Sequence, residues 1–415
     1  MGYSFFPDFL NSAGFSTDKK SYAEYLRKSA VPKEELDVFL NKNSWAQFDP
    51  EVGYIMGNYM PHDGMDNSST ISTVSAAGYR TSSVYADKAC RINTYGNSFT
   101  QCHQVSDAET WQEYLAGHLG EPIKNFGMGG FGVYQAYRRL IRREAEDKDS
   151  KYVILYMWGD DYVRSVFRCR YVTYYTKWND YGGYMFHGNF WSNIEMDPDS
   201  GILVEKKSRI SKKEDVYNMS DPDFMFENLK DDLMVQLHLL ANNLVNSDVD
   251  VKGLNRLAEI LNVAGVDFNS EESMMQTAND LKNKYSFAAT KYILGKTKEF
   301  CKKHNKKLLL IHFDPYGVLR PMIRGEARYD QEIIDYIEEN DFKFFDMNQV
   351  HVEDFKKFNI PIDEYMQRYF IGHYNPSGNH FFAYALKDTL VDWLDPKPIT
   401  YQQGDEKLIR FKGYL

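Results

Sequence analysis

The chain has 415 residues, and 49 lysines and arginines against 59 aspartates and glutamates give it a formal net charge of −10. This length predicts one large core with additions, or two domains. The acidic balance argues against nucleic acid as a partner, because binding a phosphate backbone requires a concentrated basic surface. Aromatic residues make up 15% of the chain, with 31 tyrosines, which is more than folding alone requires.

No stretch of the sequence approaches the roughly 20 apolar residues that a membrane-spanning helix needs, so no membrane partner is expected. The first residues lack a basic segment followed by an apolar one, so no secretory signal is visible; a signal removed beforehand is the open alternative. The four cysteines have no C-x-x-C spacing, which indicates neither a zinc site nor a redox pair. Reduced thiols favour a cytoplasmic location.

The first part of the chain changes character near residue 88. Residues 1–87 are predicted to form an N-terminal extension, with two helical patterns over 17–43 and an irregular stretch after them. From residue 88 strands alternate with helices. The expected elements are a strand at 90–95, a helix at 108–120, a strand at 123–127, a helix at 133–147 and a strand at 151–159.

The same alternation returns late in the chain. Its expected elements are a helix at 289–304, a strand at 306–314, a helix at 329–340, a strand at 342–346 and a helix at 379–394. We therefore predict an α/β core formed by 88–161 and 276–395, with a mostly parallel sheet that has helices on both faces. Residues 162–275 are predicted to be an aromatic-rich insertion, and 396–415 a C-terminal arm.

Two segments at the ends of expected strands are candidates for a site. Ser98 directly follows the first strand, where open α/β sheets bind their ligands, and its hydroxyl could be exposed there while nearby amides face a developing oxyanion. The alternative for Ser98 is a helix N-cap. Asn125 and Gly130 belong to a glycine-rich segment after the next strand. A glycine N–H there is a natural oxyanion donor, and the alternative is a turn that needs positive φ.

Two further segments carry groups that titrate. Asp160 and Asp161 follow an apolar strand, and without a histidine they make a poor ligand set, so no metal is expected. His373 lies in a loop before the last long helix and could reach a serine, although a single loop histidine is more often structural. Asn375 follows it.

The order of these four segments resembles that of the SGNH (GDSL-type) hydrolase superfamily. A serine follows the first strand, a glycine follows the second, a polar pair follows the third, and a histidine comes late in the chain. The resemblance covers roughly residues 78–161 and 285–393. It implies a flavodoxin-like three-layer α/β/α sandwich with Ser98 as nucleophile and His373 as base. It also implies an oxyanion hole formed by the Ser98 and Gly130 amides. Asn125 opens the segment that matches the family's glycine block, and Asn375 belongs to the segment that matches the one after the family's histidine.

The sequence departs from that family at two places. Asp160 stands where the family has an asparagine that donates to the oxyanion, so its carboxyl must be protonated, turned away or used otherwise. The family also has an aspartate two or three residues before the histidine, where this chain has Phe370 and Ile371. His373 is then expected to act with Ser98 alone or to use another carboxylate, among which we considered Asp161, Asp363 and Glu364.

The insertion opens with a run of aromatic residues between Tyr162 and Trp191. Aromatic rings suit the apolar faces of sugars, which makes Tyr174, Trp178 and Trp191 candidates for substrate binding. The alternative is an aromatic core of the insertion or a subunit contact. Arg164, Arg168 and Arg170 either pair with an anionic substrate group or balance nearby acids.

These observations predict an esterase that removes O-acyl groups, most simply acetyl, from a carbohydrate through an acyl-enzyme on Ser98. The expected partner is a small-molecule or oligosaccharide substrate, and no cofactor is required. Acyl transfer, hydrolysis of a sulfate ester, and carbohydrate binding without catalysis on a degenerate hydrolase fold are the alternatives. The sequence leaves the oligomeric state open.

Overall fold

In the computed structural model we describe residues 19–174, 182–246 and 248–402. The chain starts with two short helices, α2 (Tyr22–Lys28) and α3 (Lys33–Asn41), and an antiparallel hairpin of β1 (Ala46–Asp49) and β2 (Gly53–Met56). Ser21 caps α2 by accepting a hydrogen bond from the backbone N–H of Glu24 at 3.1 Å. The predicted N-terminal extension is therefore helical first and then forms a hairpin.

A five-stranded sheet forms the centre of the molecule, and all of its strands are parallel. Across the sheet the order is β4 (Ile123–Asn125), β3 (Ile92–Tyr95), β5 (Tyr152–Met157), β8 (Lys307–His312) and β9 (Phe344–Asp346). Counted along the chain, these five strands have the order 2-1-3-4-5. From β3 the chain adds β4 on one side and then crosses to add β5 on the other side, so the direction in which strands are added reverses between β3 and β5. Open α/β sheets bind their ligands at such a point.

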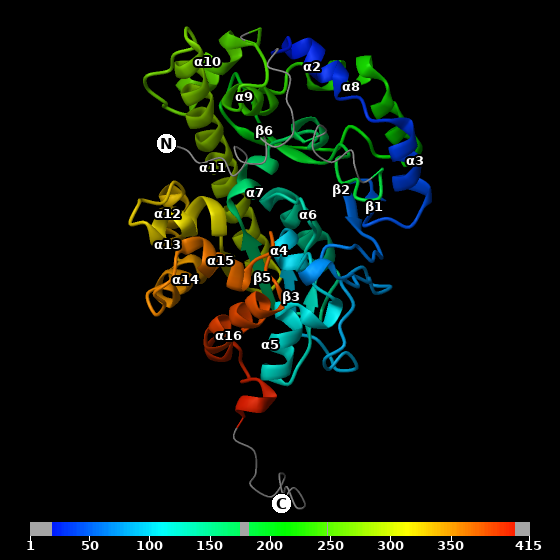
Figure 1. Ribbon diagram of the computed structural model, residues 1–415, viewed down its shortest axis with the longest axis vertical. Helices are drawn as coiled ribbons and strands as arrows, with labels where there is room; N and C mark the ends of the chain where they lie inside the picture. Colours follow the sequence, from blue (N-terminus) through cyan, green and yellow to red (C-terminus); the bar gives the residue numbers. More distant parts are fainter. Residues whose placement is uncertain (1–18, 175–181, 247, 403–415) are drawn as a thin grey trace, which may run out of the picture.

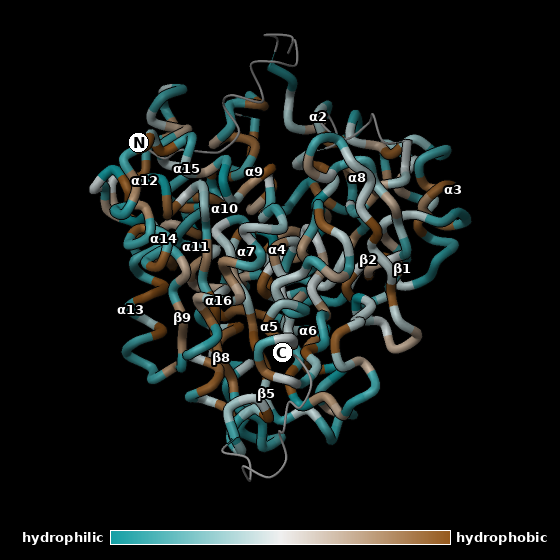
Figure 2. The backbone as a smooth tube through the Cα atoms, turned by 60° about the horizontal axis from the view of Figure 1, so that its bottom comes forward, coloured by the Kyte–Doolittle hydropathy of each residue, from teal (hydrophilic) through white to brown (hydrophobic). Residues whose placement is uncertain are grey.

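The strands are buried on both faces, which explains their continuous apolar runs. In β5, alternate residues enter two different hydrophobic clusters: Val153 and Leu155 face one, Ile154 and Tyr156 the other. Figure 2 shows the hydrophobic strands β5 and β8 in the interior among more hydrophilic helices. The predicted α/β class with a parallel sheet is confirmed.

Helices pack on each cluster. On one side lie α5 (Trp111–Leu119) and α16 (Pro376–Trp393), which contact one another through residues such as Trp111 and Phe382. On the other lie α6 (Val133–Glu144) and α11 (Glu271–Lys303). The helix expected at 289–304 is only the second half of α11, because Ser270 caps a helix that begins much earlier. The predicted boundary at residue 276 thus falls inside a helix.

The insertion packs against the N-terminal extension. Its main elements are α7 (Gly159–Arg164), β6 (Asn193–Met196), β7 (Leu203–Lys206), α8 (Pro222–Leu229), α9 (Leu233–Ala241) and α10 (Val251–Ile260). The hydroxyl of Tyr22 donates to the carbonyl of Leu229 at 2.8 Å, joining α2 to α8. In Figure 1 the blue and green helices of these two segments gather at one end of the molecule, away from α5 and α16.

The remaining helices complete the core. They are α4 (Ser98–Gln101), α12 (Arg320–Ile323), α13 (Gln331–Glu339), α14 (Met347–Phe355) and α15 (Ile362–Tyr369). A single helical turn at Ile399–Tyr401 ends the described part of the C-terminal arm. Within the described residues, none of the helices combines the length and the apolar character that crossing a membrane would require.

Candidate active site

Ser98 lies at the carboxyl end of β3, at the point where chain direction across the sheet reverses. Gly96 has φ +153°, and a Cβ there would lie 2.9 Å from the carbonyl oxygen of Tyr156, so only glycine fits the turn. Asn97 caps α4 by accepting from the Phe99 N–H at 2.8 Å. Ser98 is therefore the first residue of the helix and not its cap, which leaves its hydroxyl available for another partner.

That partner is His373. The hydroxyl of Ser98 lies 2.7 Å from Nε2 of His373, although the two residues are far apart in the sequence. The loop that carries His373 is fixed at both ends. Phe370 and Tyr374 form a β-bridge across it, and Asn375 caps α16 by accepting from the Gly378 N–H at 2.8 Å. Asn375 thus positions the loop.

Gln104 orients the imidazole of His373. Its Oε1 lies 2.9 Å from Nδ1 of the ring and accepts the backbone N–H of the same histidine at 2.8 Å. Its Nε2 donates to the carbonyl of Asp63 at 3.2 Å. The nitrogen thus faces an acceptor and the oxygen faces a donor, which fixes the orientation of the side-chain amide. Because an amide oxygen only accepts, Nδ1 carries the proton and Nε2 presents its lone pair to Ser98.

None of the three carboxylates considered above contacts His373. Asp161 is engaged elsewhere, Asp363 pairs with Arg320 at 3.0 Å on the surface, and Glu364 is exposed. The position that a carboxylate occupies in a serine–histidine–aspartate triad is filled here by a neutral amide.

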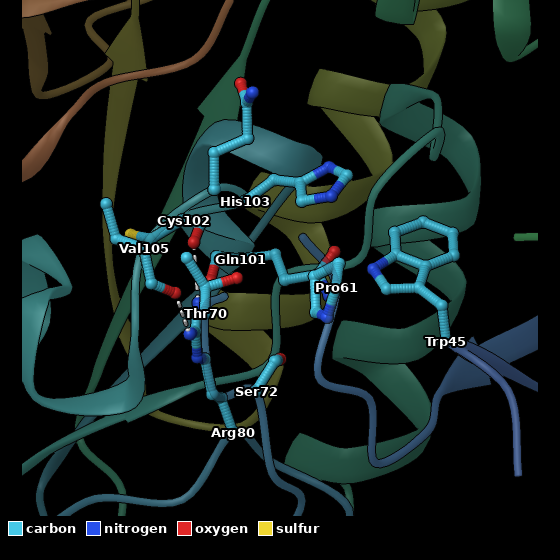
Figure 3. Close-up of a pocket in the computed structure, with 10 residues that line it drawn as sticks. Trp45, Pro61, Thr70, Ser72, Arg80, Gln101, Cys102, His103 and Val105 are labelled. Carbon is cyan, nitrogen blue, oxygen red and sulfur yellow. Dashed lines mark hydrogen bonds between the residues drawn. The ribbon is translucent and has the colours of Figure 1, made fainter. Parts of the chain in front are cut away.

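A second histidine lies beside the first. His103 pairs with Asp63 at 3.0 Å, its ring stacks on Trp45 with centroids 5.6 Å apart, and it lies 5.1 Å from the ring of His373. Figure 3 shows His103 and Trp45 among the residues that line a small pocket. Arg80 holds this segment by donating to the carbonyls of Gln101, Cys102 and Val105, each at 2.6 Å.

The electrostatics of the site keep His373 neutral. Part of the residue reaches the surface, but burial of the ring holds its pKa well below the usual value, and the nearby His103 and Arg164 lower it further. The carboxylate of Asp63 opposes them. A neutral imidazole is the form that can accept a proton from Ser98.

The backbone amides of Ser98 and Gly130 are unused. Within the described residues, neither the Ser98 N–H nor the Gly130 N–H donates a hydrogen bond. The segment before Gly130 is fixed: Gly129 donates its N–H to Oε1 of Gln101 at 2.7 Å, and Asn125 accepts from Gly127 at 2.9 Å. Asn125 is buried and shapes this turn. Two free donors on a fixed backbone can receive an oxyanion.

The two aspartates after β5 have different surroundings. Asp161 is buried and accepts from Nδ2 of Asn97 at 2.7 Å and from the Trp158 N–H at 3.0 Å, so it supports the residue before Ser98. Burial raises the pKa of Asp161 to about 8, against the lowering effect of Arg164. Asp160 is partly exposed, and its carboxylate pairs with Arg164 at 3.0 Å.

The aromatic residues expected to bind substrate are mostly internal. Trp191 is fully buried, donates its indole N–H to the carbonyl of Phe167 at 2.6 Å and, as placed, cannot reach a ligand. Tyr174 is buried against His187, with ring centroids 4.9 Å apart. Trp178 lies outside the described residues. Trp158, which the sequence did not single out, is partly exposed and lies 5.7 Å from the ring of Phe99.

Several residues of the site were missed by the sequence analysis: Gln104, His103, Asp63 and Trp158. Gln104 and His103 lie close to Ser98 in the chain, and that proximity was the one available signal. In the part of the chain described here, no three histidine, cysteine, aspartate or glutamate side chains are arranged to hold a metal ion. A comparison with protein-family models gave no match, and no curated protein is significantly similar to this sequence.

Proposed function

We propose that the protein is a serine hydrolase that cleaves O-acyl esters, with a flavodoxin-like three-layer α/β/α core of the SGNH type. The observation that carries this proposal is the contact of 2.7 Å between Ser98 and Nε2 of His373, at the point where chain direction across the sheet reverses. The same assignment is supported by the burial of the His373 ring and by Gln104, the second partner of that ring, which fixes its tautomer.

In the first step, Nε2 of His373 takes the proton of the Ser98 hydroxyl while the oxygen attacks the ester carbonyl. The amides of Ser98 and Gly130 stabilise the oxyanion of the tetrahedral intermediate. His373 then returns the proton to the leaving alkoxide, and water releases the acid from Ser98 by the same route. Gln104 accepts from Nδ1 throughout.

The proposed alcohol is a carbohydrate. Trp158 is partly exposed beside Phe99, whose ring lies 4.9 Å from that of His373, and Tyr329, 41% exposed, lies against Gly159, the residue after Trp158. Such rings can stack on the apolar face of a sugar. The acyl group we favour is acetyl.

Replacing Ser98 by alanine tests the proposal. With an acetylated sugar or a short aryl ester as substrate, kcat should fall by at least about a thousandfold, because the nucleophile is lost. His373→Gln should give a comparable loss, whereas His380→Gln, on the exposed side of α16, should leave the rate unchanged. Full activity in the Ser98 variant would reject the mechanism.

Acyl transfer to a sugar hydroxyl is a second candidate. Ser98 is only 6% exposed, and a nucleophile shielded from water favours an acyl-enzyme that waits for an acceptor. Supplying an unacetylated oligosaccharide with the ester distinguishes the two: transfer produces an acylated acceptor, whereas hydrolysis produces free acid alone.

A further inference from the structure

The three arginines at the start of the insertion have different partners. Arg168 pairs with Glu195 at 2.7 Å and with Asp231 at 2.5 Å, and Arg164 pairs with Asp160 and Asp161. Arg168 and Arg164 therefore balance nearby acids.

Arg170 differs from both. Among the described residues, no carboxylate lies within ion-pair distance of its guanidinium, and its Nη1 is buried without a hydrogen-bond partner. Its guanidinium lies over the face of Tyr174, 5.1 Å from the guanidinium carbon to the ring centroid, and beside the hydroxyl of Tyr54. A charged group with a buried donor that lacks a hydrogen-bond partner is costly unless an anion joins it.

The position of Arg170 connects it to the proposed site. Gly130 has φ +79°, and a Cβ on it would overlap Nη1 of Arg170 and lie 2.6 Å from the hydroxyl of Tyr54. Glycine is thus required at this position to admit the guanidinium as well as for the backbone conformation. The unused Nη1 of Arg170 and the unused N–H of Gly130 belong to groups in direct contact.

Other charges in this region have the same sign. Arg170 lies close enough to Arg164 to lower the pKa of the Arg164 guanidinium, and both arginines lie near Tyr54 and His187. Lys282, on α11, lies near Asp160. Asp160 and Asp161 both pair with Arg164, so within the described residues neither of them is a counterion of Arg170.

We propose that Arg170 binds an anionic group, a carboxylate or a sulfate, which the substrate carries close to its acyl ester. This inference rests on the proposed function of Ser98 and adds a substrate class: acylated acidic sugars in preference to neutral ones. Nη1 of Arg170 donates a charge-assisted hydrogen bond to the anion, beside the amide that receives the oxyanion.

Binding to the Ser98→Ala variant tests the anion site without turnover. Galacturonate and galactose 6-sulfate are compared with neutral galactose by calorimetry, so that the two anions are distinguished from each other. At least one of them should bind about ten-fold more tightly than galactose. Adding Arg170→Gln should remove the difference, and Arg170→Lys should keep part of it.

The matched control is Arg256→Gln, which removes the same charge from an exposed pair on α10. It should leave the preference for the charged sugar intact. Equal binding of charged and neutral sugars, no binding of either anion, or a preference that survives Arg170→Gln would overturn the anion site. A preference for the anion in a protein without esterase activity would reject the catalytic proposal alone.

Two further measurements separate this role from others. With acylated substrates, Arg170→Gln should raise KM for the charged sugar, and kcat/KM should fall at least about ten-fold more for the charged ester than for a neutral one. An equal loss of kcat on both would place Arg170 at the oxyanion instead and overturn the proposal. Without ligand, Arg170→Gln should melt at the same temperature as the native protein or higher, because an unpaired buried charge is removed; a lower melting temperature would indicate a structural role.

Discussion

At the scale of single residues, the most informative substitution in the site is Gln104 in the position of a carboxylate. A carboxylate would stabilise the imidazolium that forms when Ser98 loses its proton, whereas an amide only fixes the tautomer. The carboxylate of Asp63 acts on His373 from beyond His103, with which it pairs. A base with a lowered pKa stays neutral in acid, which suits catalysis over a wide range of pH.

Gln104→Glu should move the acid limb of the pH profile of kcat/KM upward. The new carboxylate favours the charged imidazole, so the pKa of His373 rises from its low value and activity is lost at a higher pH on acidification. The native profile should show no acid limb at the usual histidine pKa of about 6.5, because the pKa of His373 lies well below it. Gln104→Ala, which removes the orienting group, should lower kcat by about ten- to a hundredfold. A limb that does not move in the glutamate variant would contradict the assigned contact.

Gly130→Ala should abolish most activity. The added Cβ would displace Arg170 and Tyr54, and φ +79° disfavours alanine by about 1–2 kcal/mol. Gly325→Ala is the matched control, because Gly325 has the same φ of +79° with nothing within 4 Å of its Cβ. Gly130→Ala should lose more stability in urea unfolding than Gly325→Ala, because only its Cβ overlaps neighbouring atoms, and only Gly130→Ala should lose kcat. Equal activities in the two variants would remove Gly130 from the site.

At the scale of elements, α11 connects the insertion to the sheet. The hydroxyl of Tyr285, buried on this helix, accepts the N–H of Met196 in β6 at 2.7 Å. Tyr285→Phe should lower the free energy of unfolding by about 1–3 kcal/mol, because a buried N–H is left without a partner. Tyr292→Phe, on the same helix with a contact of 3.4 Å to Glu205, should cost less than about 0.5 kcal/mol in the same urea titration. Equal losses of unfolding free energy in the two variants would show that burial of the Tyr285 hydrogen bond has no effect on stability.

Most core elements could be predicted from the sequence, because strands buried on both faces have continuous apolar runs and helices between them have capping residues. The serine and histidine could also be proposed, since each follows a recognisable strand or precedes a helix. The role of Gln104 could not be predicted. It depends on the backbone φ of +70° at Gln104 itself and on contact with His373, which lies 269 residues away in the chain. For the same reason Arg170 could not be separated from Arg164 and Arg168: the three differ only in which acids the fold brings to them.

At the scale of the whole molecule, the buried histidines make stability depend on pH. His351 accepts and donates between the hydroxyls of Tyr365 and Tyr374 at 2.9 and 2.7 Å, and burial alone lowers its pKa to about 3. An unfolded histidine has a pKa near 6.5. The unfolded chain therefore binds more protons between these values, and the contribution of His351 to stability is lost as the pH falls through them.

Between pH 7 and pH 5, His351 should contribute a loss of about 2 kcal/mol in the free energy of unfolding. Asp161, whose pKa of about 8 is raised, acts in the opposite direction: its contribution is largest in acid and is lost as the pH rises to 8. The test is consequently the difference between variants. Urea unfolding of His351→Gln should show a smaller loss on acidification than the native protein, and His380→Gln should match the native protein. Parallel pH dependences of all three would contradict a neutral buried His351.

The position of the insertion affects how the protein is made. Strand β8 pairs with β5 along its whole length, yet residues 158–306 separate the two strands. At usual translation rates of about 5–20 residues per second, the apolar edge of β5 waits on the order of ten seconds for its neighbour. An unpaired apolar edge invites aggregation. The N-terminal extension and the insertion, which share a core and emerge first, can fold during this delay, so the nascent chain would have a partly folded cover on the ribosome before the sheet is complete.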